Sequence, residues 1–223
     1  MWRGTSQLLI STLEQAGPHP SCIVRRIAER YSHLYITVQI SEPLGFDGLQ
    51  HTPNGSSGGR ASASSSPSSP SLSPLRVSVQ RRITGRPQTV RNAGVYVVDL
   101  GSPSTSPSES LASLTARVTA ELFAHLPILR DNRGATLVVA MRLLPDPGSV
   151  DVGVEAAART RDLVLLQLAN ERDLEVSELV DLVQNVGDAS GRLAVVSRAR
   201  GRDNSVVALG IKFQASGNSV STA

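Results

Sequence analysis

The stretch ATLVVAMRLLPDPG, residues 135–148, decides the fold of this chain. Its first ten residues are apolar except for Thr136 and Arg142, and the Pro-Asp-Pro-Gly turn that follows predicts the end of a buried strand. Two helical patterns and two alternating runs come after the turn, over residues 154–170, 175–186, 192–198 and 205–214. The block therefore predicts a strand, two helices and a terminal antiparallel hairpin.

The first of these helical patterns, residues 154–170, is strongly periodic. Its polar side holds Arg159, Arg161 and Asp162. Its expected core residues include three leucines, namely Leu163, Leu166 and Leu168. The second pattern, residues 175–186, has the apolar spacing that is typical of core packing.

The chain upstream of this block alternates strand and helix patterns. Strand patterns cover residues 7–16, 34–39, 75–80 and 94–100, and helical patterns begin at Ser21 and cover residues 109–126. Alternation of this kind predicts an α/β fold with a doubly wound, mostly parallel sheet. The final hairpin adds antiparallel strands at its C-terminal side.

Residues 50–74 form a segment rich in Ser, Pro and Gly. Such a segment has too few apolar side chains to offset about 1 to 2 kcal/mol of backbone entropy per ordered residue, so we expect it to be disordered. The part of the chain before it is marginal in size for a core of its own. We therefore expect residues 1–223 to form a single domain with a long surface insertion.

The composition argues against several classes of partner. The net charge is only +3, Lys212 is the sole lysine, and the arginine clusters, such as the one around Arg82, lack the interleaved aromatic residues of single-strand binders. We interpret these arginines as a solvated face or loop and expect no nucleic-acid partner. No apolar run approaches the roughly 18 residues of a membrane helix, so no membrane segment is predicted.

Cysteine and histidine usage sets further limits. The single Cys22 excludes an internal disulfide and favours a reducing, cytoplasmic location. The four histidines show no spacing typical of metal ligands, so we expect no metal site.

Several short motifs, in a fixed order, suggest a family. LLPDPGS at residues 143–149 is followed by RDL at 161–163, NER at 170–172 and the acidic Glu178, and AERYSHL at 28–34 lies upstream. This order resembles the small-molecule S-adenosylmethionine-dependent O-methyltransferases of plant and fungal secondary metabolism, over residues 12–214. The resemblance implies a class I methyltransferase-like, Rossmann-like sheet, S-adenosylmethionine as cofactor and a small-molecule substrate.

The resemblance assigns cofactor-binding positions at the ends of the early strands. Glu14 corresponds to the acidic residue after the first strand, Gly17 to the glycine-rich turn that lets the backbone approach the cofactor, and Glu42 to the ribose-binding acid. Asp99 adds a carboxylate at the end of the strand over residues 94–100, where doubly wound sheets bind ligands. The chain departs from the family at Pro18 and Pro20, which remove backbone donors from the turn.

The catalytic positions depart further. Family members carry a His just after the fourth strand as the general base, whereas residues 100–105 contain none, and Met141 stands where an acid would orient that base. Glu171 matches the second family acid and is the catalytic candidate, although a salt bridge or cap at a helix end is the simpler explanation of this residue. The family's N-terminal dimerisation domain is absent from the sequence, which assigns neither substrate nor oligomeric state.

Two functions follow from these residues. In the first, the protein is an O-methyltransferase of secondary-metabolite biosynthesis that transfers a methyl group from S-adenosylmethionine to a hydroxyl of a small molecule, mainly by proximity and orientation. The alternative is a catalytically degenerate protein with the methyltransferase fold that acts as an accessory or non-methylating pathway protein.

Overall fold

The computed structural model describes residues 7–13, 21–42, 77–83, 85–101, 114–170, 172–201 and 206–216. These residues contain the strands β1 (Gln7–Leu13), β2 (Tyr35–Glu42), β3 (Val77–Ile83), β4 (Val95–Gly101), β5 (Thr136–Arg142), β6 (Gly187–Asp188), β7 (Gly191–Arg200) and β8 (Val206–Ala215). They also contain the helices α1 (Ser21–Arg30), α2 (Leu114–Asp131), α3 (Val152–Ala169) and α4 (Val176–Gln184). The predicted insertion, residues 50–74, lies outside the described residues, and the single-domain assignment stays a prediction.

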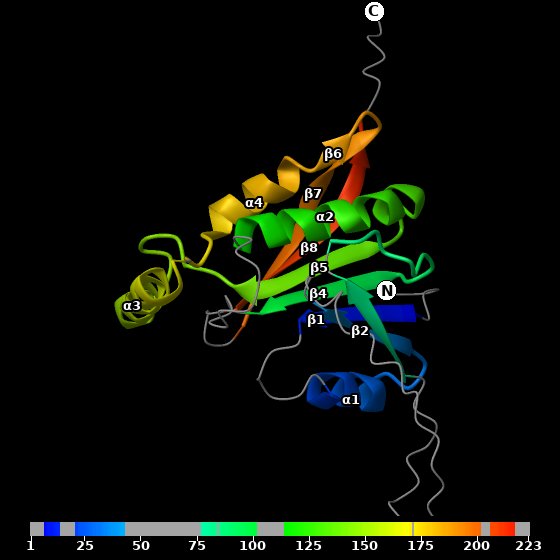
Figure 1. Cartoon of the computed structure of the whole chain (residues 1–223), viewed down its shortest axis with the longest axis horizontal. Coiled ribbons are helices and arrows are strands. Elements are labelled where there is room, and N and C mark those ends of the chain that lie inside the picture. The colour runs from blue at the N-terminus through cyan, green and yellow to red at the C-terminus, as the bar shows by residue number, and fades with distance from the viewer. Residues whose placement is uncertain are drawn as a thin grey trace, which may run out of the picture.

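The strands form one sheet with the order β3-β2-β1-β4-β5-β8-β7-β6 (Figure 1). Strands β1 to β5 are parallel, β8 runs antiparallel to β5, and β7 and β6 extend the sheet with further antiparallel pairs. The predicted α/β fold and the C-terminal hairpin of β7 and β8 are therefore confirmed. The sheet as a whole is mixed, because three of its outer pairings are antiparallel.

Helices cover the two faces of the sheet differently (Figure 1). Ile36 and Val38 of β2 pack with Val24 of α1 in a small apolar cluster, which Val97 of β4 also touches. The next residue, Val98, points to the opposite face and belongs to the larger core. Because successive side chains of a strand point to opposite faces, α1 covers one side of the sheet and the larger core the other.

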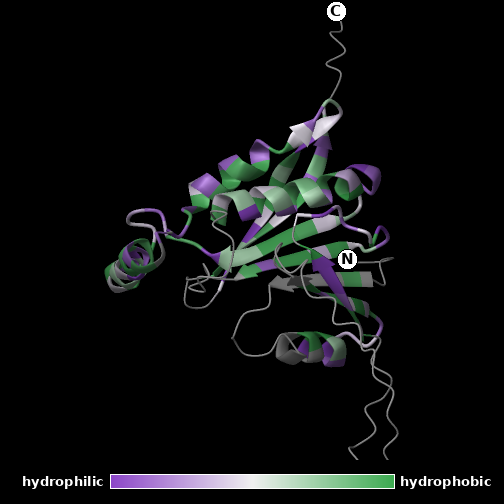
Figure 2. Cartoon of the chain, in the orientation of Figure 1, coloured by the Kyte–Doolittle hydropathy of each residue, from purple (hydrophilic) through white to green (hydrophobic). Residues whose placement is uncertain are grey.

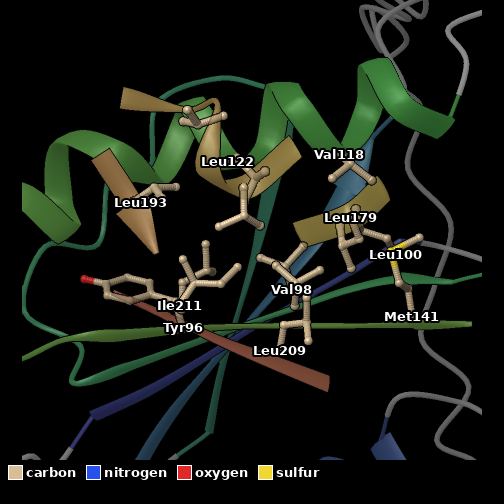
Figure 3. Packing of buried hydrophobic residues seen from close by; sticks show 14 of the residues in the cluster. Tyr96, Val98, Leu100, Val118, Leu122, Met141, Leu179, Leu193, Leu209 and Ile211 are labelled. Carbon is tan, nitrogen blue, oxygen red and sulfur yellow. The ribbon is translucent and has the colours of Figure 1, made fainter. Parts of the chain in front are cut away.

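The larger core lies between α2, α4 and the strands β4, β5, β8 and β7. Figure 3 shows Leu122 of α2 and Leu179 of α4 pointing toward strand residues that include Val98, Met141 and Leu209. Hydropathy follows this arrangement, since β4 and β5 carry the most continuous apolar stretch of the sheet (Figure 2). The block quoted at the outset thus supplies β5, α4 and the hairpin to one core.

Helix α2 extends further than its sequence pattern predicts. We expected residues 109–126, but the helix continues through Pro127 to Asp131, and residues 109–113 lie outside the described residues. A proline inside a helix costs about 3 kcal/mol because it lacks an N–H donor. Ile128 and Leu129, which follow it, are 5% and 1% exposed, so burial of the last turn offsets that cost.

Helix α3 contradicts the expectation that its leucines are core residues. Leu163, Leu166 and Leu168 are 58%, 48% and 78% exposed, and α3 lies beside the body of the molecule instead of on the sheet (Figure 1). The larger core on this face of the sheet is built by α2 and α4, and no residue of α3 belongs to it. No helix of the described residues, α3 included, has the length and apolarity that crossing a bilayer requires.

The core position of Leu122 gives a direct test of this packing. Leu122→Ala should lower the free energy of unfolding by about 2 to 5 kcal/mol, because Leu122 is 0% exposed and its truncation leaves a cavity. Urea unfolding followed by circular dichroism measures the change. Phe123→Ala is the matched control on the same helix, since Phe123 is 49% exposed and should cost less than about 1 kcal/mol. Equal losses in the two variants would contradict the assigned orientation of α2.

Candidate functional site

The strand order reverses between β1 and β4, which are neighbours at the centre of the sheet. From this point the chain adds β2 and β3 on one side and β5 on the other. In open α/β sheets, ligands bind outside the carboxyl ends of the strands at such a reversal. The carboxyl edge of β1, β2 and β4 is therefore the candidate ligand site.

The structure brings two of the predicted cofactor residues to this edge. Asp99 pairs with Thr12 near the ends of β4 and β1, and its side chain is exposed. Glu42 is the last residue of β2, which pairs with β1 on the other side. Asp99 and Glu42 thus end strands that flank β1, and their assignment to a cofactor stays a prediction.

The other predicted site residues fall on parts of the chain that the structure leaves undescribed. Glu14 and Gly17 belong to the segment after β1, and Glu171 belongs to the connection between α3 and α4. Their roles therefore stay predictions.

No described histidine lies at the carboxyl edge, where methyl transfer to a hydroxyl would need a base. His33 lies in the turn that leads into β2, at the opposite edge, and His125 is buried on α2. Met141, at the position of the family's orienting acid, is 2% exposed and packs in the core, where Figure 3 shows it beside Leu100. The described part of the edge thus offers apolar packing where the family has acid and base groups.

Among the described residues, no group of three or more His, Cys, Asp or Glu side chains is placed to hold a metal ion. A hollow of about 520 Å³ lies between the end of α4 and the turn from β6 to β7, and it is lined by residues such as Gln184, Arg192 and Gln214. The hollow lies near the carboxyl end of β8. Because β8 runs antiparallel to β5, this end of β8 lies at the edge of the sheet opposite the candidate site.

A buried polar cluster, which the sequence did not reveal, lies between β2, β3 and α2. Its members are Gln39, Arg82, Gln88, Glu121 and His125, all at most 8% exposed. Arg82 Nη1 donates to Glu121 Oε2 at 2.7 Å, and the amides of Gln39 and Gln88 exchange hydrogen bonds of 3.0 and 2.7 Å. The interpretation of Arg82 as solvated was therefore wrong, because Glu121 gives its charge a buried partner.

His125 occupies the inner end of this polar cluster. Its Nδ1 lies 2.8 Å from the carbonyl oxygen of Glu121, which can only accept, so the proton is on Nδ1 and Nε2 is left to accept from Gln88 at 3.5 Å. Burial holds the pKa of His125 below its usual value, Glu121 opposes this shift and Arg82 adds to it. The imidazole is thus a neutral structural group that also packs edge-on to the Tyr96 ring.

The depressed pKa of His125 predicts a pH dependence of stability. The unfolded chain takes up a proton near pH 6.5 and the folded protein only at lower pH, so the free energy of unfolding should fall as the pH drops from about 6.5 toward the folded pKa. Urea unfolding midpoints measured at several pH values test this, with His125→Asn as the comparison. The variant should lose less stability over that interval than the parent, and identical pH profiles would contradict a buried neutral imidazole.

The motifs that carried the family resemblance form a brace between α3 and α4. Arg161 is hydrogen-bonded to the carboxylate of the buried Asp173, whose backbone N–H donates to Asp162 Oδ1 at 2.7 Å. Arg159 bonds Glu175 Oε1 at 3.1 Å from the other side of the connection. Burial raises the pKa of Asp173, and Arg161 opposes that shift. The RDL motif therefore has a structural role in this chain.

Glu178 completes the brace at the start of α4. Its carboxylate accepts from the backbone N–H of Glu175 at 2.9 Å in a capping box and also binds Arg172, which holds the pKa of Glu178 below its usual value. Arg172 and Asp173, which follow Glu171 in the sequence, both take part in these bonds, whereas Glu171 itself lies outside the described residues. The neighbours of the catalytic candidate are therefore engaged in holding two helices together.

The chain was compared with protein-family models and with curated proteins. No protein-family model matches the chain. Among curated proteins, the monodictyphenone cluster transcriptional coactivator mdpA of Emericella nidulans is 46% identical over 139 residues, which are 62% of this chain and 29% of mdpA. A transcriptional coactivator of Pseudocercospora fijiensis is 50% identical over 141 residues, 63% of this chain and 37% of that protein. The coactivator nsrH of Aspergillus novofumigatus is 37% identical over 194 residues, 86% of this chain and 37% of nsrH.

Solved structures with the same fold include methyltransferases. The chain matches the methyltransferase CalO6 with a TM-score of 0.56 at 13% identity, over 92% of this chain and 56% of CalO6. The chain has a methyltransferase-like fold. LepI in complex with SAM matches with a TM-score of 0.58 at 12% identity, over 95% of this chain and 44% of LepI. A protein described as a pericyclic reaction enzyme matches with a TM-score of 0.57, so the fold also serves other reactions.

The comparisons correct the first of the two predicted functions. Methyl transfer is our main prediction from the sequence, and it is contradicted, because the three curated relatives are named as transcriptional coactivators, mdpA as that of the monodictyphenone cluster. The resemblance to O-methyltransferases is confirmed at the level of the fold, and LepI, which shares this fold, is solved in complex with SAM. The chain spans about a third of the length of the curated relatives, between 29% and 37% of the three described.

Proposed function

We propose that the protein is a non-methylating coactivator of transcription for a fungal secondary-metabolite gene cluster. The observation that carries this proposal is the identity of 46% with the monodictyphenone cluster transcriptional coactivator mdpA and of 50% with a further transcriptional coactivator. An identity this high over 141 residues exceeds the 12% to 13% shared with solved structures of the same fold. The relatives therefore inform the function, and the structures inform the fold.

The described residues agree with a non-enzymatic role. At the carboxyl edge, Met141 is part of the core, and the described histidines lie elsewhere. The motif residues Arg161, Asp162 and Glu178 make structural bonds that require no substrate. A coactivator needs a stable folded body and an accessible surface. The core packing of Met141 and the structural bonds of the motif residues contribute to the stable folded body.

We propose that such a coactivator acts through protein partners and not by binding DNA itself. The net charge of +3 is small, and Arg82, from one of the two densest arginine clusters, is buried against Glu121. Phosphate contacts dominate affinity for DNA, so we propose that a chain of such small net charge depends on another protein for it. The cytoplasmic location predicted from Cys22 stays a prediction, which imaging of a tagged protein during metabolite production would test.

Deletion of the gene in its native fungus tests the proposed function. Transcripts of the neighbouring biosynthetic genes should fall at least about tenfold, which quantitative sequencing of RNA would measure. Unchanged transcripts together with loss of one methyl group from the metabolite would contradict the proposal and restore the enzymatic reading.

Complementation of the deletion tests whether the function requires the carboxyl edge of the sheet or only the folded protein. The double variant Glu42→Gln, Asp99→Asn should restore transcripts as fully as the unaltered gene, because we propose that the carboxyl edge performs no chemistry. The matched control is Leu122→Asp, which places a carboxylate at a fully buried position and should fail to restore them. A double variant as inactive as this control would show that the carboxyl edge is needed.

We further propose that the protein does not use S-adenosylmethionine as a methyl donor. Of the family's glycine-rich turn only Gly17 remains, and Pro18 and Pro20 remove backbone donors from the same loop. Calorimetric titration with millimolar S-adenosylmethionine should release no heat, and the melting temperature should not rise. Binding at micromolar concentration would overturn this proposal and leave the transcript experiment unaffected.

A further inference from the structure

Helix α3 carries the densest group of exposed apolar side chains among the described residues. Val152, Leu163, Val164, Leu166 and Leu168 are between 45% and 81% exposed. Of the four leucines of the helix, only Leu165, at 8% exposed, is buried. Exposed apolar groups of this density on one element mark a surface that another protein covers.

The outward surface of α3 is also free of charge. The helix contains four charged residues, Glu155, Arg159, Arg161 and Asp162, and each is bonded to the adjoining loops. Glu155 accepts from Gly148, Arg159 bonds Glu175, and Arg161 and Asp162 bond Asp173. All four point back toward the body, so the side that faces away from it consists of neutral residues. A neutral surface favours an equally neutral partner.

The middle of this outward surface is a seam of seven exposed residues on the side of the helix opposite Leu165. The seam comprises Gly153, Ala156, Ala157, Thr160, Leu163, Val164 and Gln167. Its residues are small before Thr160 and large after it. The seam is thus narrow at one end and wide at the other.

We propose that a second copy of this chain covers α3, with the two α3 helices antiparallel about a twofold axis at Thr160. In that arrangement Ala157 faces Leu163 of the second copy and Ala156 faces its Val164, so that small residues meet large ones along the whole seam. A twofold axis brings identical residues together at its centre, and Thr160 is uncharged and small enough to meet itself. A parallel pairing of the two helices would place the large residues of one copy against the large residues of the other, and the small residues against the small ones.

The dimension of the seam sets the strength of the pairing. An 18-residue helix is about 27 Å long, and a contact between two such helices falls below the roughly 1,200 Å² of a strong specific interface. The dimer should therefore dissociate at micromolar concentration. It rests only on the surface of α3 and is independent of the proposed function.

Sedimentation velocity from low to high micromolar concentration tests the pairing. The parent protein should shift from monomer to dimer across this range, and Val164→Glu should remain a monomer because it places two carboxylates in the seam. Phe123→Glu is the matched control, because Phe123 is an exposed apolar residue of α2 with a similar exposure, 49% against 45% for Val164. A monomeric parent, or a Val164→Glu protein that dimerises like the parent, would overturn the proposal.

Cysteine cross-linking tests the orientation of the helices. In a Cys22→Ser background, Thr160→Cys should form a disulfide-linked dimer on mild oxidation, because the axis brings the two sulfur atoms together. Ala157→Cys should not, since its counterpart across the seam is Leu163. Equal cross-linking of the two variants would show a parallel pair of helices. Cross-linking of neither variant would show that the seam is not an interface, and either result would overturn the proposal.

Discussion

Burial of one face of β4, β5 and β8 beneath α2 and α4 is the interaction on which the rest of this structure depends. It joins residues from Ala93 to Phe213 in one apolar cluster, and it fixes the two helices that link β4 to β5 and β5 to the hairpin. No residue of α3 belongs to this cluster, and Leu163, Leu166 and Leu168 remain exposed beside it.

The sequence predicted this core because its signals are local. The apolar run of β5, the turn at residues 145–148 and the period of α4 each depend on neighbours within a few positions. The error at Leu163, Leu166 and Leu168 arose because periodicity shows that a helix has an apolar side but not what covers it. The error at Arg82 has the same origin, since a charge appears exposed in a sequence until its buried partner, here Glu121, is known.

The sequence predicted the location of the candidate site but not its chemistry. Asp99 and Glu42 end strands that flank β1, as expected for ligand positions in an α/β sheet. Their chemistry could not be derived from the sequence. Whether a carboxylate at a strand end binds a cofactor, forms an ion pair or does neither depends on which loops fold next to it, and those loops lie far away in the sequence. In the motifs that suggested methyl transfer, Arg161 of RDL bonds Asp173 in the connection between α3 and α4, and Glu178 caps the start of α4. Both motifs therefore have a structural role that requires no substrate.

The polar cluster between β3 and α2 has a consequence for how the two sides of the sheet respond to temperature. Strand β3 has only one buried side chain, Arg82, so its attachment to α2 depends on an ion pair and hydrogen bonds. The hairpin on the other side depends on apolar burial, which weakens as water is cooled. Cold would therefore loosen β7 and β8 before β3, whereas acid, which protonates His125 within the polar cluster, would loosen β3 first. One sheet thus contains two regions whose stability responds to different conditions.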